Sequence, residues 1–488
     1  MPCTTILVGR NATYDGSTMM ARNEDSPSGS FTSKKWIVVN PKDQPRHYQS
    51  KLTHFHMDLP EEPLRYTAMP NALPDEGFWG EAGVNEANVA MSETETITSN
   101  ARVLGADPLV PDGIGEEDML LLVLPYIRSA REGVLRLGHL LETFGTCELN
   151  GIGFQDMEEV WWLESIGGHH WIAKRVPDDR YVVMPNQQGI DEMDLADALG
   201  EQKNHMCSRD LADFIRNHHL DLRMNSSTAV SLEDERHFPI RPAFGSKDDA
   251  DHTYNTPRAW FMLRYLNPTS FRWEGEQADF TPESDNLPWS LVPEQKITVQ
   301  DVKYLLSSHY QGTAYDCYGH KGDAHTRHLY RPIGINRNNF LALTQLRPYM
   351  PKEKAAVEWL AVGCNVFNSF IPFYANVTAT PAYLAQTDKN PNSSQFYWAS
   401  RIIAALADAH FAACSSAIER YQGASFHKAQ ALLETSDRTP LPEDVTGFLA
   451  SCNEKMAALA KEETDRCLGQ VLYEASNEMK NSFARSDS

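Results

Sequence analysis

A cysteine stands third in the chain, after Met1 and Pro2, and a segment with an arginine and two acidic residues occupies positions 22–25. If Met1 and Pro2 are removed, Cys3 becomes the N-terminal residue and carries both a thiol and a free α-amine. A thiol ionises near pKa ~8.5 and an α-amine near ~7.7–8.0, so the amine can accept the thiol proton close to neutral pH. An N-terminal amine that acts as base for its own side chain is an established nucleophile–base pair. These residues predict nucleophilic attack on an amide carbonyl.

A β-hairpin is expected to position this cysteine. Residues 3–9 are rich in β-branched side chains and predict a strand, Tyr14-Asp15-Gly16-Ser17 predicts a turn, and 18–22 predicts the returning strand. The hairpin would bring Cys3 to the same end of the sheet as 22–25. Arg22 would then lower the thiol pKa, and Asp25 would hold the α-amine. An ordinary ion pair between Arg22 and Asp25 at the hairpin end is the alternative.

The remaining elements indicate an α+β fold. Apolar residues at helical spacing predict a helix over 120–141, with Gly145 as its C-cap. The chain becomes strongly helical from about residue 397, and a second long helix is expected to begin near 442–444. The stretch 270–300 is expected to be a loop. We expect one large domain with a helical C-terminal region packed on it. Further strands are predicted at 35–39, 88–92, 160–164, 170–175 and 181–184.

The composition limits the partners of the chain. It has 488 residues, of which 41% are apolar and 23% charged, and a formal net charge of −22. Nucleic acids and anionic membranes select basic surfaces, so neither is an expected partner. The negative charge fits either simple solubility or a field that favours substrates with a free amine. No apolar stretch reaches membrane-spanning length and no signal peptide is visible, so we expect a cytoplasmic protein. The sequence allows a homo-oligomer but does not require one.

Metal and cofactor sites are not expected. The eight cysteines form no Cys-x-x-Cys pair, and the histidines at 54, 56, 169 and 170 lack partners at metal-site spacing. The segment 151–153 lacks the third glycine of a dinucleotide loop, and no phosphate-binding loop or serine-nucleophile elbow occurs. Cys3 therefore remains the best candidate for chemistry.

Several segments resemble one known family. The opening of the chain is similar to peptidase family C69, the dipeptidases known from lactic acid bacteria, within the N-terminal nucleophile (Ntn) hydrolases. The resemblance extends from residue 3 to at least 400. The segments that carry it are Cys3-Thr4-Thr5-Ile6-Leu7-Val8-Gly9, Ala21-Arg22-Asn23-Glu24-Asp25, Trp79-Gly80-Glu81-Ala82-Gly83-Val84-Asn85-Glu86, Met184-Pro185-Asn186-Gln187, Tyr254-Asn255-Thr256-Pro257-Arg258, His309-Tyr310-Gln311-Gly312-Thr313 and Arg331-Pro332-Ile333-Gly334.

The resemblance implies roles for five residues. Penicillin V acylases and bile-salt hydrolases, more distant relatives, share an N-terminal Cys followed by Arg-Asn-x-Asp. By this match Cys3 is the nucleophile, Arg22 the cation beside the thiol, and Asp25 the carboxylate that orients the amine. Asn186 is the oxyanion-hole candidate, with a turn role as its alternative. Arg258 is the second arginine of the cluster, with helix capping as its alternative.

The resemblance also implies the fold and the activity. It implies a four-layer αββα sandwich, with residues 1–2 as a propeptide, 3–400 as the catalytic domain and 401–488 as a helical extension. The implied activity is cleavage of small peptides, namely dipeptides, through a thioester. An acylase of the penicillin V acylase or bile-salt hydrolase type is one alternative, and a non-catalytic interaction protein like the secernins is another. Glu93 and Glu95, in the predicted loop at 91–96, have two interpretations. They pair with a substrate amine, or they belong to a solvated acidic loop.

Overall fold

Two antiparallel sheets form the centre of the molecule. The computed structural model describes residues 3–224 and 231–480. In this part of the chain a seven-stranded sheet has the order β16-β12-β1-β2-β17-β18-β19, and a six-stranded sheet has the order β14-β11-β10-β9-β8-β7. The strands of the larger sheet are β1 (Cys3–Val8), β2 (Thr18–Asp25), β12 (Tyr181–Met184), β16 (Ser290–Leu291), β17 (Asn338–Leu346), β18 (Ala356–Val362) and β19 (Ile371–Tyr374). Those of the smaller are β7 (Ala82–Val84), β8 (Ala90–Glu95), β9 (Asn150–Gln155), β10 (Val160–Ser165), β11 (Trp171–Arg175) and β14 (His205–Cys207).

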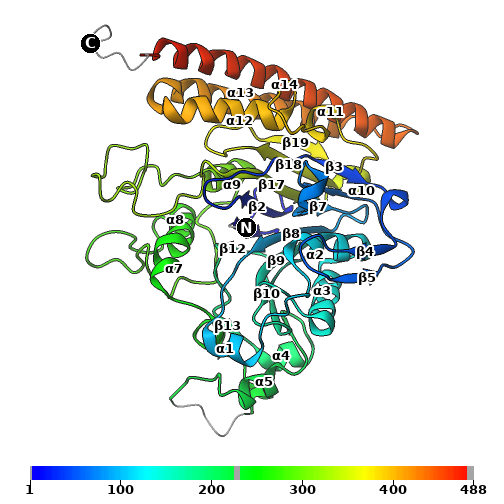
Figure 1. Cartoon of the computed structure of the whole chain (residues 1–488), viewed down its shortest axis with the longest axis vertical. Helices are drawn as coiled ribbons and strands as arrows, with labels where there is room; N and C mark the ends of the chain where they lie inside the picture. The colour runs from blue at the N-terminus through cyan, green and yellow to red at the C-terminus, as the bar shows by residue number, and fades with distance from the viewer. Residues whose placement is uncertain (1–2, 225–230, 481–488) are drawn as a thin grey trace.

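The two sheets pack face to face, and helices cover their outer sides. Strands β1 and β2 contact β8, and β2 also contacts β9 (Figure 1). Helices α13 (Phe411–Arg438) and α14 (Val445–Asn477) pack on β19, and α12 (Phe396–Ala409) packs on β18. Helix α2 (Glu116–Val123) contacts β8, and α3 (Ala130–Phe144) contacts β9, β10 and β11. The α+β class predicted from the sequence is confirmed.

Shorter elements connect these layers. Three small ribbons pair β3 with β6, β4 with β5, and β13 with β15. Their bounds are β3 (Ile37–Val39), β4 (His47–Gln49), β5 (His56–Asp58), β6 (Tyr66–Ala68), β13 (Glu192–Met193) and β15 (Phe238–Pro239). The remaining helices are α1 (Ala101–Ala106), α4 (Leu195–Leu199), α5 (Leu211–Asn217), α6 (Ile240–Phe244), α7 (Asp249–Tyr254), α8 (Thr256–Leu266), α9 (Val299–Leu306), α10 (Lys352–Ala355) and α11 (Ala382–Ala385). Within the described ranges, no helix combines the length and the apolar character that crossing a bilayer requires.

Two predicted helices are interrupted. The periodic stretch 120–141 is divided between α2 and α3, because Pro125 lacks the N–H that would continue the first helix. Gly145 caps α3 as predicted, with a φ of 71° that glycine adopts without strain. The C-terminal stripe breaks at His410, which lies between α12 and α13 with non-helical dihedral angles. The start of the last helix is confirmed, since Asp444 accepts a hydrogen bond from the N–H of Gly447.

A buried carboxyl group in β18 makes the stability of the fold depend on pH. The Glu358 side chain is fully buried and accepts a hydrogen bond of 3.1 Å from Trp36 Nε1. Burial raises the pKa of Glu358 to about 8, against the lowering effect of hydrogen bonds from Thr67 and Trp36. In the unfolded chain this group ionises at its ordinary pKa. Between the two pKa values the unfolded chain loses its proton first, so this group lowers the free energy of unfolding as the pH rises.

Glu358→Gln is therefore expected to stabilise the protein at pH 8 and to have little effect near pH 4. At about 1.4 kcal/mol for each unit of pKa difference, the gain at pH 8 should be a few kcal/mol. Urea unfolding of both proteins across this pH range measures it. A constant difference between the two proteins at every pH would contradict the prediction.

Candidate active site

The β1–β2 hairpin places Arg22 against the Cys3 thiol. The strands pair antiparallel with Cys3 opposite Glu24 and Thr5 opposite Arg22. Directly opposed residues point to the same face of a sheet, as do alternate residues along a strand, so Cys3, Arg22 and Glu24 share one face. Arg22 Nη2 lies 2.6 Å from Cys3 Sγ, and both side chains are fully buried. The predicted meeting of Cys3 with Arg22 is thus present.

Two carboxylates hold the Arg22 guanidinium in place. Nη1 of Arg22 lies 2.5 Å from Glu81 Oε2, and Nη2 lies 3.2 Å from Glu116 Oε1. Glu81 immediately precedes β7, and Glu116 is the first residue of α2. Arginine fits this task because its planar fork of N–H donors can serve several acceptors in fixed directions. Its orientation toward Sγ is therefore fixed by residues from two other elements.

The thiol is neutral in this form of the chain. Burial raises the pKa of Cys3 to about 12, although the neighbouring Arg22 lowers it; the Glu116 and Glu81 carboxylates raise it further. The thiolate is the reactive form of cysteine. At neutral pH the cysteine is therefore held in its protonated, weakly nucleophilic state.

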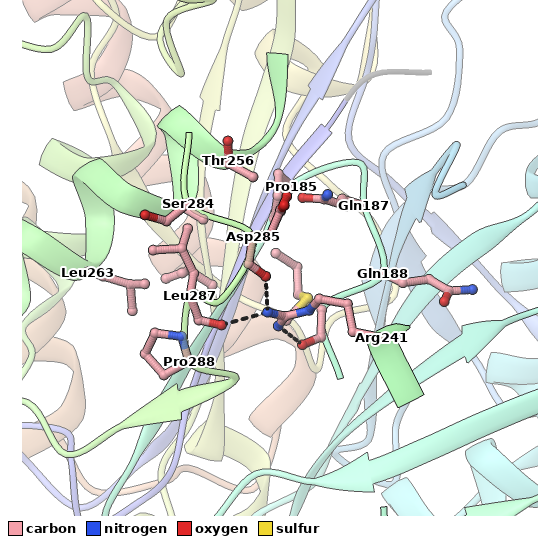
Figure 2. A pocket seen from close by; sticks show the side chains of 14 residues that line it. Pro185, Gln187, Gln188, Arg241, Thr256, Leu263, Ser284, Asp285, Leu287 and Pro288 are labelled. Atoms are coloured by element: carbon pink, nitrogen blue, oxygen red, sulfur yellow. Dashed lines mark hydrogen bonds between the residues drawn. The ribbon is translucent and has the colours of Figure 1, made fainter. Parts of the chain in front are cut away.

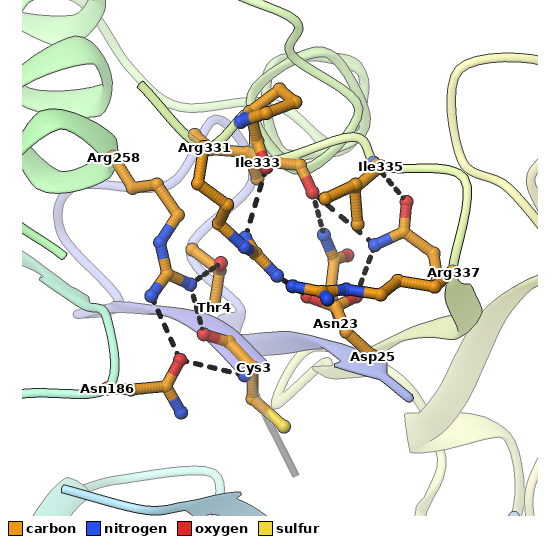
Figure 3. A network of polar contacts seen from close by, with 12 residues as sticks. Cys3, Thr4, Asn23, Asp25, Asn186, Arg258, Arg331, Ile333, Ile335 and Arg337 are labelled. Carbon is orange, nitrogen blue, oxygen red and sulfur yellow. Dashed lines mark hydrogen bonds and ion pairs between the residues drawn. The ribbon is translucent and has the colours of Figure 1, made fainter. Parts of the chain in front are cut away.

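Asn186 and Arg258 converge on the backbone of Cys3 (Figure 3). Asn186 follows β12, and its Oδ1 accepts hydrogen bonds from the Cys3 backbone nitrogen (3.0 Å) and from Arg258 Nη2 (2.9 Å). Arg258 lies in the first turn of α8, and its Nη1 donates to the Cys3 carbonyl oxygen at 2.5 Å and to Thr4 Oγ1 at 2.7 Å. Because Oδ1 accepts hydrogen bonds from two donors, the orientation of the Asn186 side-chain amide is fixed. Its Nδ2 group is therefore the hydrogen-bond donor of this side chain.

Asp25 lies on the other face of the hairpin. Its carboxylate is bound by Arg331 and Asn338, whereas the Cys3 nitrogen donates to Asn186 (Figure 3). The reason is that β2 continues to Asp25, three residues beyond Arg22, and an odd spacing along a strand reverses the side-chain direction. The amine-orienting role of Asp25 remains a prediction for a chain that begins at Cys3.

Sequence patterns alone assign no role to a group of buried charged residues beside Arg22. Lys34 Nζ lies 2.6 Å from Glu24 Oε2 and 3.9 Å from Glu81 Oε1, and all three side chains are buried. Glu81 has a φ of 64°, a left-handed backbone conformation that is unusual outside glycine. Such strained positions concentrate at functional sites. The sequence pattern does not link these residues to one another, because they come from separate elements.

A small cavity lies behind the segment that carries Asn186. It has a volume of about 30 Å³, enough for one or two water molecules, and so is too small for a peptide. The Arg241 guanidinium crosses it and donates to the carbonyl oxygens of Gly189 (2.5 Å), Leu287 (2.8 Å) and Asp285 (3.0 Å) (Figure 2). Arg241 therefore ties the segment after Asn186 to the loop around 285–287 and limits its movement.

Comparison with known proteins shows the family of this chain. The model of peptidase family C69 matches residues 2–424. A dipeptidase of Bifidobacterium longum is 53% identical over the whole length of both chains. A probable dipeptidase A of Streptococcus pyogenes serotype M3 is 51% identical, again over the whole of both chains. Dipeptidase A of Lactobacillus helveticus is 40% identical over 97% of this chain and 96% of its own. The buried Cys3 that starts β1 and contacts Arg22 therefore lies in a peptide-bond hydrolase, and the chain belongs to peptidase family C69.

Proposed function

We propose that the protein is a cysteine-type dipeptidase whose nucleophile is Cys3, exposed as the N-terminal residue by removal of Met1 and Pro2. The observation that carries this proposal is the 2.6 Å contact between Cys3 Sγ and the Arg22 guanidinium. The names of the similar proteins, which are dipeptidases or probable dipeptidases, support the choice of substrate.

In the proposed mechanism the α-amine of Cys3 is the base. It takes the thiol proton, while Arg22 stabilises the thiolate, which attacks the peptide carbonyl carbon. The negative charge on the carbonyl oxygen is stabilised by Asn186 Nδ2 and a backbone N–H. The protonated α-amine then gives its proton to the leaving amine as the C–N bond breaks and a thioester forms. Water, deprotonated by the α-amine, attacks the thioester, and the thiolate leaves.

Processing at the N-terminus is part of this proposal. Removal of Met1 alone leaves Pro2 bonded to the Cys3 nitrogen, so the amine stays blocked. Either cleavage of the Pro2–Cys3 bond by the protein itself or a proline-specific aminopeptidase must complete the maturation. We further propose that the two sheets and their covering helices form the four-layer sandwich of Ntn hydrolases. In that fold 3–400 would be the catalytic domain and 401–488 the helical extension.

Intact mass, N-terminal sequencing and a substrate panel test the function together. The purified protein is expected to begin at Cys3 and to hydrolyse dipeptides faster than acylated amines. Faster cleavage of acylated amines would favour an acylase instead. A protein that retains residues 1–2 and cleaves neither class would contradict an enzymatic role for Cys3.

Asn186→Ala is expected to lower kcat for dipeptide hydrolysis by about 10²–10³, the usual cost of one oxyanion donor. The substrate KM should change much less, because the donor acts on charge that develops after binding. Steady-state kinetics on a single dipeptide measures both constants. Gln187→Ala, one residue further along the same loop, is the matched control and should retain activity. A loss confined to KM would contradict the oxyanion role.

A further inference from the structure

Three buried glutamates form a cluster next to the nucleophile. Glu81, Glu93 and Glu116 each offer a carboxylate oxygen, and these oxygens all lie within 4.8 Å of one another. All three side chains are fully buried. Glu93 comes from β8, the strand of the smaller sheet that passes next to β1 and β2 (Figure 1). Like charges at this separation repel one another, so the cluster needs compensation by cations.

The nearby cations form ion pairs with Glu81 and Glu116, whereas among the described residues Glu93 forms none. Arg22 binds Glu81 and Glu116, and Lys34 binds Glu24. Both carboxylate oxygens of Glu93 are buried and have no hydrogen-bond donor among the described residues. Burial, followed by repulsion from Glu81 and Glu116, raises the pKa of Glu93 well above its ordinary value. An unpartnered buried carboxyl group is costly, which indicates that a ligand supplies the missing donor.

The cluster is fixed in position and lies one guanidinium away from the thiol. Arg22 Nη2 contacts both Cys3 Sγ, at 2.6 Å, and Glu116 Oε1, at 3.2 Å. The backbone N–H of Glu93 donates to the Glu81 carbonyl oxygen at 3.0 Å, which joins the two acidic residues. The Glu81 and Glu116 carboxylates are therefore held on the same guanidinium as the reacting sulfur, and Glu93 is joined to Glu81 through the backbone.

This separation matches the chemistry of a dipeptide. In a dipeptide the free amine and the scissile carbonyl carbon are joined through a single Cα, so they lie only about 2.5 Å apart. A group that binds the amine must then lie within one residue of the nucleophile, as this cluster does. A longer peptide cut in its interior, or an acylated amine, would place a neutral group there and leave the carboxylates uncompensated.

We propose that Glu93, together with Glu81 and Glu116, binds the α-ammonium group of the substrate's N-terminal residue. The inference rests on the proposed dipeptidase function and assigns the residues that recognise the free amine. Three carboxylates around one ammonium group provide an acceptor for each of its N–H donors. Arg22 is thereby shared between the thiol and the binding site, which couples substrate binding to the nucleophile.

Glu93→Gln tests this assignment, with Glu358→Gln as the matched control. Glu358 is also a fully buried glutamate, but it lies in β18 and contacts Trp36. The substrates are alanyl-alanine and N-acetyl-alanyl-alanine, and where acetylated peptide is cleaved too slowly, its inhibition constant is measured instead. The wild type should strongly prefer the free amine. Glu93→Gln should lower kcat/KM for alanyl-alanine by about 10²-fold, as loss of one partner of a buried charged contact does. The value for the acetylated peptide should stay within a few fold.

Other results would overturn the assignment. An equal loss on both substrates would make Glu93 structural, and an unchanged preference would exclude it from amine binding. Loss of wild-type activity on treatment with a chelator, restored by a divalent metal, would mean that the cluster holds a metal ion. Glu93→Asp keeps the charge and should retain the preference with a higher KM, which controls for folding. If the wild type does not prefer the free amine over the acetylated peptide, the inference fails while the dipeptidase function stands. If the wild type cleaves neither peptide, the proposed function itself fails.

Discussion

Replacing Cys3 with alanine is expected to abolish dipeptide hydrolysis, by roughly 10⁶-fold in kcat if the effect matches loss of the nucleophile in other covalent hydrolases. No other group in the proposed mechanism can form the thioester. The substitution removes only one sulfur atom from a buried position, so a cost of about 1 kcal/mol in stability is expected, and the variant should fold. Cys3→Ser should also be inactive, because a hydroxyl is far harder to ionise than a thiol.

The same variant separates the two routes of maturation. If the protein cleaves its own Pro2–Cys3 bond, Cys3→Ala should retain Pro2 whereas the wild type begins at Cys3. If a proline-specific aminopeptidase does the work, both proteins should begin at position 3. Intact mass and the dipeptide assay provide both readouts. Cys414→Ala, at a buried cysteine of α13, is the control and should remain active. Substantial activity in Cys3→Ala would refute the proposed nucleophile.

The hairpin is the part of the site that local sequence determines. Strand periodicity from Cys3 and the turn at 14–17 require β1 and β2 to pair, and the pairing brings Arg22 beside Cys3. Both signals act over a few residues, so they can be read without knowledge of the remaining chain. Asn186 and Arg258 were identified by family resemblance alone, and the structure brings both to the Cys3 backbone.

The direction of Asp25 shows where local signals end. The sequence predicts a returning strand over 18–22 and brings 22–25 to the Cys3 end of the sheet, without a side-chain direction for Asp25. In the structure β2 continues to Asp25 because β17 pairs with it along its whole length. Strand alternation then applies to Asp25 and directs it away from the thiol. A pairing partner more than 300 residues away in the chain decided this side-chain direction.

The acidic cluster could not be predicted for a related reason. Glu81 precedes a short strand, and Glu93 lies in a sequence that resembles an exposed acidic loop. Glu116 begins a helix, where acidic residues are common because they interact favourably with the helix dipole. They come together because β7 pairs with β8, which sets Glu81 beside Glu93, and because α2 packs on β8. For Glu93 and Glu95 the sequence leaves pairing with a substrate amine and a solvated loop as alternatives, and the Glu95 side chain lies outside what the structure describes. The complete burial of Glu93 excludes the solvated loop for that residue.

Arg22→Gln is expected to cause both a large loss of activity and a large loss of stability. The glutamine has no charge to stabilise a thiolate, so kcat should fall by about 10³ or more. It also leaves Glu81 and Glu116 without their buried cation. Removing one partner of a buried ion pair costs about 3–5 kcal/mol, because the remaining charge is left uncompensated. Urea unfolding and steady-state kinetics on the same dipeptide measure the two effects.

A double variant distinguishes the two roles of Arg22. Arg22→Gln combined with Glu81→Gln replaces one buried ion pair by two neutral amides that can hydrogen-bond to each other. The double variant should regain much of the stability that Arg22→Gln loses, because the uncompensated charge at Glu81 is gone. Activity should stay well below that of Glu81→Gln alone, because the thiolate still lacks its cation. Recovery of activity together with stability would mean that Arg22 acts only by holding the fold, and the cation beside Cys3 would then have no part in the chemistry.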